Sequence, residues 1–187
     1  MSSRLAALAV VLMVLALVAG SGAFDAVVAD RTAVVDVATD ADALLGLTSH
    51  TGPNGAFTYV SDGQLVLDLS GSNPNSDATA GPIYGATGVN AGSTTRVDDV
   101  FNVTNQGTVP VCVWLTEDSA AVSLFATTGG HGPVGTVGES YGLVPGETVT
   151  VGFAVDSGGA AVGDRLLDGV TVHAETDAGC DTTTGGA

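Results

Sequence analysis

The chain has 187 residues, of which 20 are acidic and 4 are basic, and its formal net charge is -16. This charge argues against nucleic acid and anionic membrane surfaces as partners, because both would repel the protein. The length suits one domain with a sizeable core, with or without a processed segment.

All basic residues are arginine, and the chain contains no lysine. Lysine-free, aspartate-rich chains resemble those of extremely halophilic archaea. At 1 M salt the Debye length falls to roughly 3 Å, so charges are strongly screened, and a large excess of charge keeps a protein soluble under these conditions. An acidic secreted protein of another origin is the alternative.

The N-terminal segment predicts a secretory signal peptide over residues 1–23. Arg4 gives a weakly basic start, residues 5–19 are all apolar, and small residues follow as far as Ala23. This order is typical of a signal that is cut before Phe24. A spanning helix needs about 20 apolar residues, so permanent anchoring through this segment is the weaker alternative. The run lacks a preceding Arg-Arg pair and a following cysteine, which argues against a twin-arginine signal and a lipoprotein anchor.

Three further regions are predicted after the signal. An apolar arm occupies residues 24–30, a β-sandwich domain occupies residues 31–176, and residues 177–187 form a small polar tail. The arm consists of Phe24, Asp25, Ala26, Val27, Val28, Ala29 and Asp30.

The first part of the domain predicts strands separated by turns. Residues 31–38 are rich in valine and predict a strand, whereas residues 39–49 predict a short helical turn capped by Thr39 or Asp40. Strands over residues 57–60 and 64–70 flank Ser-Asp-Gly, which is a hairpin signal. Residues 71–93 form the longest irregular stretch.

Residues 95–116 form the centre of the predicted fold. The segment divides into two strand-like runs joined at residues 105–107, Asn-Gln-Gly, and therefore predicts a hairpin. The first run alternates apolar and polar residues, with Val100 as the exception. The second run, residues 109–115, is apolar on both faces and predicts a central, well-covered strand.

Four more strands are predicted over residues 121–127, 140–144, 148–155 and 169–176. The strand at 148–155 has the clearest alternation of apolar and polar residues. Eight or nine short strands without an amphipathic helix beyond the signal predict an all-β protein. We expect an antiparallel β-sandwich, jelly-roll or immunoglobulin-like, after an N-terminal signal helix.

Cys112 and Cys180 are the only cysteines. Export to oxidising surroundings and an even count predict a disulfide between them. In the loop-entropy model a ring of this length contributes on the order of 4 kcal/mol, less any strain. Two separate thiols, with Cys112 buried, are the alternative.

Asn102, Val103 and Thr104 form an N-x-[ST] sequon that proline does not block. Alternation places Asn102 and Thr104 on the face opposite Val103, so the acceptor nitrogen could reach solvent. Asn102 is therefore a candidate glycosylation site. An unmodified asparagine is the alternative, because such triplets also occur by chance.

No pattern in the chain nominates a catalytic or metal-binding residue. His50, His131 and His173 share no ligand spacing, and an H-E-x-x-H motif is absent. The acidic pairs match no calcium loop, so a solvated acidic face is preferred to calcium, and no cofactor is expected. These pairs are Asp40 with Asp42, Asp98 with Asp99, and Asp164 with Asp168. The glycine-rich residues 129–135 lack the lysine of a phosphate loop, and no G-x-S-x-G is present.

Two segments resemble a family of secreted haloarchaeal proteins defined only as a domain of unknown function. They are the signal followed by ADRTAVVDVATDADALLGL (residues 29–47), and DDVFNVTNQG (residues 98–107) followed by a valine-rich strand. With LVPGET (residues 143–148), the chain is also remotely similar to the TasA/camelysin group of biofilm-fibre proteins. Camelysin has been classed as a peptidase, but the zinc motif for that role is absent here.

The remote resemblance implies a jelly-roll-like fold and polymerisation by donation of an N-terminal strand. We therefore expect a secreted or cell-surface, non-enzymatic structural protein of the surface or extracellular matrix, with other copies or other surface proteins as partners and no small-molecule substrate. The alternative to strand donation between copies is that the arm pairs within its own domain or stays disordered. A surface binding module, in which the loops at residues 71–93 and 129–135 hold glycan or calcium, is the alternative function.

Overall fold

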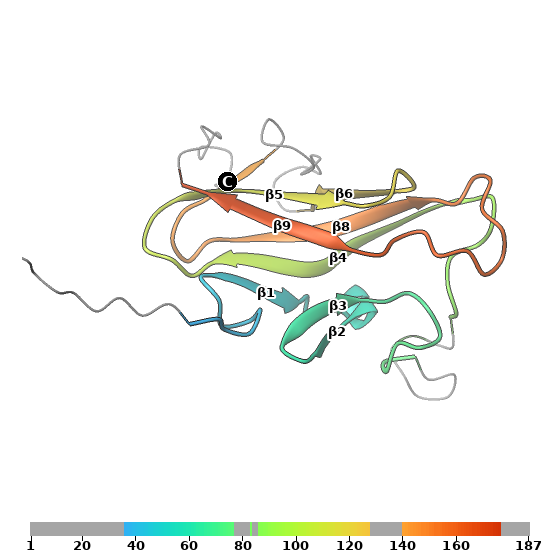
Figure 1. Cartoon of the computed structure of the whole chain (residues 1–187), viewed down its shortest axis with the longest axis horizontal. Helices are drawn as coiled ribbons and strands as arrows, with labels where there is room; N and C mark the ends of the chain where they lie inside the picture. Colours follow the sequence, from blue (N-terminus) through green and yellow to red (C-terminus); the bar gives the residue numbers. More distant parts are fainter. Residues whose placement is uncertain (1–35, 77–82, 84–85, 128–139, 177–187) are drawn as a thin grey trace, which may run out of the picture. The chain divides into compact units, whose positions relative to one another are not determined.

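The computed structural model describes residues 36–76, 83, 86–127 and 140–176 (Figure 1). The chain divides into two units, Met1–Asp36 and Val37–Ala187, and the fold described below is that of the second unit. The predicted signal (1–23), the arm (24–30) and the tail (177–187) lie outside the described residues. None of the helices in the described segments is long and apolar enough to cross a membrane.

The described residues form nine strands and one short 3-10 helix, η1. The strands are β1 (Leu45–Ser49), β2 (Thr58–Ser61), β3 (Gln64–Leu67), β4 (Thr94–Asn105), β5 (Val111–Glu117), β6 (Val122–Ala126), β7 (Tyr141–Leu143), β8 (Thr148–Asp156) and β9 (Val170–Glu175), and η1 is Pro53–Phe57. One sheet has the order β1-β4-β8-β6, a second has the order β7-β5-β9, and β2-β3 is a separate hairpin. Every strand pair is antiparallel, which confirms the predicted all-β fold.

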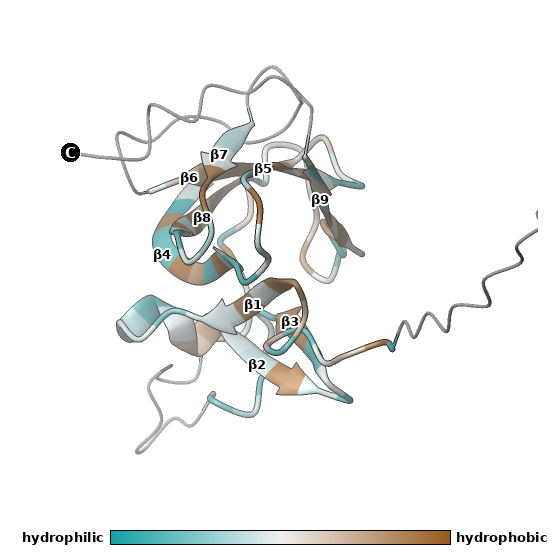
Figure 2. Ribbon diagram, turned by 90° about the vertical axis from the view of Figure 1, so that its left-hand side faces the viewer, coloured by the Kyte–Doolittle hydropathy of each residue, from teal (hydrophilic) through white to brown (hydrophobic). Residues whose placement is uncertain are grey.

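The two larger sheets enclose one hydrophobic core (Figure 2). The alternation predicted for β8 is confirmed, because Val149, Val151 and Phe153 all lie in this core. Val113 and Leu115 of β5 face them from the other sheet. Full burial of each such side chain contributes about 1.5–3 kcal/mol relative to exposure, so this interface is the main source of stability.

A bulge in β4 explains why Val100 breaks the alternation of its strand. Val97 pairs with Phe153 and Phe101 pairs with Val151, so three residues of β4 lie opposite one residue of β8. Within the bulge Asp99 has a positive φ of 56°. The extra residues bring Val100 into the core without reversing the faces of Phe101 and the residues after it.

The predicted hairpin over residues 95–116 is wrong in its pairing, although both of its strands exist. β4 pairs with β1 and β8, whereas β5 is the central strand of the other sheet, between β7 and β9. The connection therefore crosses from one sheet to the other. The position of β5 confirms the well-covered central strand, which begins at Val111, after Pro110.

The segment before β2 also differs from prediction. The predicted turn is present, since the main-chain N–H of Asp42 donates to the carbonyl of Thr39 at 3.0 Å. Residues 45–49 are not helical but form β1, because Leu45 and Leu47 alternate towards the core and the segment pairs along β4. Residues 36–38 of the predicted first strand form no strand, and residues 31–35 lie outside the described residues.

The β2-β3 hairpin confirms its prediction. Asp62 and Gly63 connect the strands, with positive φ angles of 51° and 81°. A two-residue turn with both angles positive matches the right-handed twist of the strands, which explains the Asp-Gly sequence.

Candidate functional site

A groove of about 580 Å³ lies between β3 and β9. Leu47 of β1 and Phe101 of β4 line it together with side chains from both strands. Apolar wall residues come from β3, from β9 and from the loop before β9: Leu65, Val66, Leu67, Leu167, Val170 and Val172. Polar side chains, Gln64 and Asp168 among them, also line the groove, which therefore has mixed walls contributed by segments about a hundred residues apart in the sequence.

The two strands beside the groove differ in how their outer edges are occupied. Asp40 covers the edge of β3, because its Oδ2 accepts the main-chain N–H of Leu65 at 2.6 Å and its own N–H donates to the carbonyl of Gly63 at 2.8 Å. β9 is the last strand of its sheet and pairs, within the described part of the chain, with β5 alone. The open edge beside the groove is thus that of β9.

The loop that leads into β9 is held by Asp118, which follows β5. Its Oδ1 accepts the main-chain N–H of Asp168 at 3.1 Å. The N–H groups of Asp168 and, next in importance, of Gly169 lower the pKa of the Asp118 carboxyl below its ordinary value. A charged carboxylate therefore fixes this wall of the groove. The nearby ion pair of Arg165 with Asp168 is exposed and contributes little.

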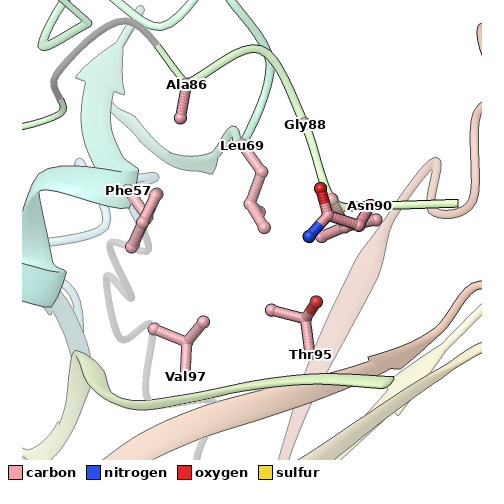
Figure 3. Close-up of a pocket in the computed structure, with 8 residues that line it drawn as sticks. Phe57, Leu69, Ala86, Gly88, Asn90, Thr95 and Val97 are labelled. Carbon is pink, nitrogen blue, oxygen red and sulfur yellow. The ribbon is translucent and has the colours of Figure 1, made fainter. Parts of the chain in front are cut away.

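A second pocket, of about 170 Å³, lies where the row of β3 leucines continues beyond the strand. Leu69 lines this pocket together with Phe57 and Val97, and Figure 3 shows these side chains pointing into a common space below Ala86. Leu65, Leu67 and Leu69 are all partly buried against the core. One alternating face of residues 64–69 thus lines first the groove and then the pocket.

A family model described as a protein of unknown function, DUF1102, matches residues 37–180. The chain belongs to this family. The match spans the described sandwich and includes both walls of the groove. No curated protein matches the chain.

The structure places the two predicted modification sites as follows. Asn102 lies on the outward face of β4, opposite Thr48 of β1 and Thr150 of β8. Cys112 is buried on β5, beside Gly142 of β7 and Glu175 of β9. Cys180 lies outside the described residues, so the disulfide stays a prediction.

The acidic pairs weighed for calcium are engaged in local contacts. Asp42 accepts from the hydroxyl of Thr39, and Asp99 accepts from the hydroxyl of Thr127. Asp98 pairs with Arg96. In the segments that the structure describes, no three His, Cys, Asp or Glu side chains are close enough to hold a metal ion.

The histidines are not brought together by the described fold. His50 accepts the N–H of Gly52 at 3.0 Å in the turn after β1. His173 of β9 stacks on Trp114, its partner on the neighbouring strand β5 of the same sheet. His131 and the glycine-rich residues 129–135 lie outside the described residues.

Sequence reasoning missed the groove. The leucine alternation at residues 65–69 indicated a buried face, but nothing local indicated that β9 would lie across from it. The inward side chains of Val170 and Val172 follow from the alternation of residues 169–176, but the position of β9 at a sheet edge follows only from its pairing with β5.

Proposed function

We propose that this protein is exported and acts as a non-enzymatic structural subunit of the cell surface or extracellular matrix, the arm of one copy adding a strand beside β9 of the next. The observation that supports the proposal is the groove, which combines apolar wall residues with an open strand edge. Extended segments bind such edges through main-chain hydrogen bonds, while alternate side chains fill the pockets beneath.

The arm at residues 24–30 has the length and pattern that such an edge requires. Seven extended residues span about 23 Å, which is comparable with the six residues of β9. Phe24, Ala26 and Val28 share one face of the extended arm. We assign this face to the groove because it is apolar until Asp30, whereas the opposite face begins with Asp25.

The sequence resemblances point in the same direction. The signal and the residues after it resemble secreted haloarchaeal proteins, and the remote similarity to the TasA/camelysin group implies fibres built by strand donation. High acidity would keep such a surface protein soluble at molar salt, because added charge offsets strong screening.

The test compares the mature chain, residues 24–187, with a chain that lacks residues 24–30. We expect the mature chain to form filaments in electron micrographs and high-mass species in light scattering, and the truncated chain to stay monomeric. A synthetic peptide with the sequence of residues 24–30 is expected to bind the truncated monomer. Filaments that persist without the arm, or a mature chain that stays monomeric, would refute strand donation.

Two matched arm variants test which face enters the groove. Val28→Asp places a carboxylate among the apolar wall residues and is expected to abolish assembly. Val27→Asp adds the same charge to the opposite face and is expected to leave assembly nearly intact. Equal loss in both variants would contradict the assigned face.

A further inference from the structure

Beyond assembly, the outward face of the β1-β4-β8 sheet forms a neutral platform around Asn102. The residues opposite Asn102 are Thr48 and Thr150, and the residue two positions along β4, Thr104, lies opposite Thr148. All five side chains are uncharged in a chain with 20 acidic residues. The hydroxyls of Thr104 and Thr148 are 2.8 Å apart and hydrogen-bonded.

The side-chain oxygen of Asn102 accepts a hydrogen bond, whereas its side-chain nitrogen is free to react. Its Oδ1 accepts the hydroxyl of Thr150 at 3.0 Å. Its Nδ2 donates no hydrogen bond to any described residue. None of the buried side-chain nitrogens in the described segments lacks a partner, so this unpaired Nδ2 is exposed to solvent.

We propose that Asn102 carries an N-linked glycan that lies over this platform of threonines. The sequon supplies the acceptor, and the sheet holds Asn102 and Thr104 on the same outward face. In the reaction Nδ2 loses one proton and bonds to the anomeric carbon of a sugar, while the bond from that carbon to the phosphate oxygen of a polyprenyl-phosphate-linked oligosaccharide donor breaks and the polyprenyl phosphate leaves. A host transferase outside the membrane provides the catalysis.

The fold makes this modification compatible with a filled core. Phe101 lines the groove and Val103 is wholly buried, so their side chains occupy the inner face of β4. Asn102 lies between them in sequence and points the other way. A glycan on Asn102 therefore covers the sheet face opposite the groove, and the proposed assembly surface stays free.

The test uses the full chain expressed in a glycosylating archaeal host and recovered from medium or cell surface. Intact mass and peptide mapping are expected to show an oligosaccharide on the peptide that contains Asn102. Asn102→Gln and Thr104→Ala are expected to lose the added mass completely, whereas Thr104→Ser, which preserves the sequon, retains it. Thermal melting of each variant shows whether a lost glycan reflects misfolding.

The inference shares only the export step with the proposed function. An exported protein with the mass of its bare sequence, or a glycan retained in Thr104→Ala, would overturn it. Glycosylated monomers would overturn strand donation and leave the glycan assignment standing. A chain found solely inside the cell would overturn both.

Discussion

The side-chain amide of Asn105 donates a hydrogen bond of 3.0 Å to the main-chain carbonyl of Leu143. Asn105 ends β4 in one sheet, and Leu143 ends β7 in the other, so one side chain ties the sheets together where the chain crosses between them. The same amide donates to the carbonyl of Val109 at 2.8 Å, and its oxygen accepts the N–H of Gly107 at 2.9 Å. Asn105 is 1% exposed and its bond to Leu143 is buried, whereas its partners Gly107 and Val109 lie in a partly exposed turn.

Asn105→Ala is therefore expected to lower the free energy of unfolding by about 1–3 kcal/mol, because it leaves the buried carbonyl of Leu143 unpaired. Chemical denaturation at fixed salt measures the loss. Gln106→Ala is the matched control: its amide makes an exposed hydrogen bond to the carbonyl of Ala41, and its removal is expected to cost under about 1 kcal/mol. Similar losses in the two variants would show that Asn105 does not join the sheets.

The crossover at Asn105 also shows why strands were predictable and their pairing was not. A strand's faces follow from its own residues, so the alternation in β8 and the apolar run of β5 located both strands correctly. Asn-Gln-Gly allows a chain reversal, but it does not distinguish a hairpin from a crossover. Whether β5 can pair with β4 depends on the other strands: β1 and β8 pair with the two edges of β4, and neither is next to β4 in the sequence.

The candidate groove was beyond prediction for the same reason. Its two walls are contributed by β3 and β9, and their separation depends on the pairing of β5 with β9. The bulge at Asp99 and the strand at Leu45–Ser49 were missed because a positive φ at aspartate and a glycine-containing strand carry weak local signals. By contrast, the outward direction of Asn102 was predictable because it needs only the alternation of one strand.

Gly152 lies in the middle of β8, where the structure leaves no room for a side chain. A Cβ there would lie 2.6 Å from the carbonyl oxygen of Val97 and 2.7 Å from a ring carbon of Phe125. Arg96 covers the same ring, with its guanidinium carbon 3.5 Å from the ring centroid. We expect Gly152→Ala to destabilise the fold by about 1–3 kcal/mol, because backbone and a buried ring must move.

Thermal and chemical unfolding of Gly152→Ala test this expectation, with Gly169→Ala as the matched control. A Cβ at Gly169 has its nearest neighbour, an oxygen of Asp118, at 3.8 Å, which is ordinary contact. The control is expected to change stability by less than about 0.5 kcal/mol. A tolerated Gly152→Ala would mean that β4 and β6 adjust freely around it.

Trp114, the single tryptophan of the chain, stacks on His173 with ring centroids 4.9 Å apart and 5° between the planes. A hydrogen bond of 2.9 Å between Thr116 Oγ1 and His173 Nε2 holds the imidazole in place. His173→Ala is expected to cost about 0.5–1.5 kcal/mol and to shift tryptophan emission to longer wavelength, because the indole gains contact with water. His50→Ala removes an imidazole elsewhere and is expected to leave the emission unchanged; a shift there, or none in His173→Ala, would contradict the local origin of the signal.

The acid stability of the loop before β9 depends on Asp118. The N–H groups of Asp168 and Gly169 lower the pKa of its carboxyl below the ordinary 3.8, so the folded state favours the charged form. This contribution to stability is fully present above the unfolded-state pKa and disappears as the pH falls through the lower folded-state pKa. We therefore expect Asp118→Asn to be less stable than the wild type at neutral pH, and the difference to shrink below pH 3.8. Unfolding measured from pH 7 to pH 2 tests this, with Glu117→Gln as a control that removes the same charge from a side chain without a hydrogen bond to the loop. A constant difference across the whole range would show that the carboxylate does not hold the loop by its charge.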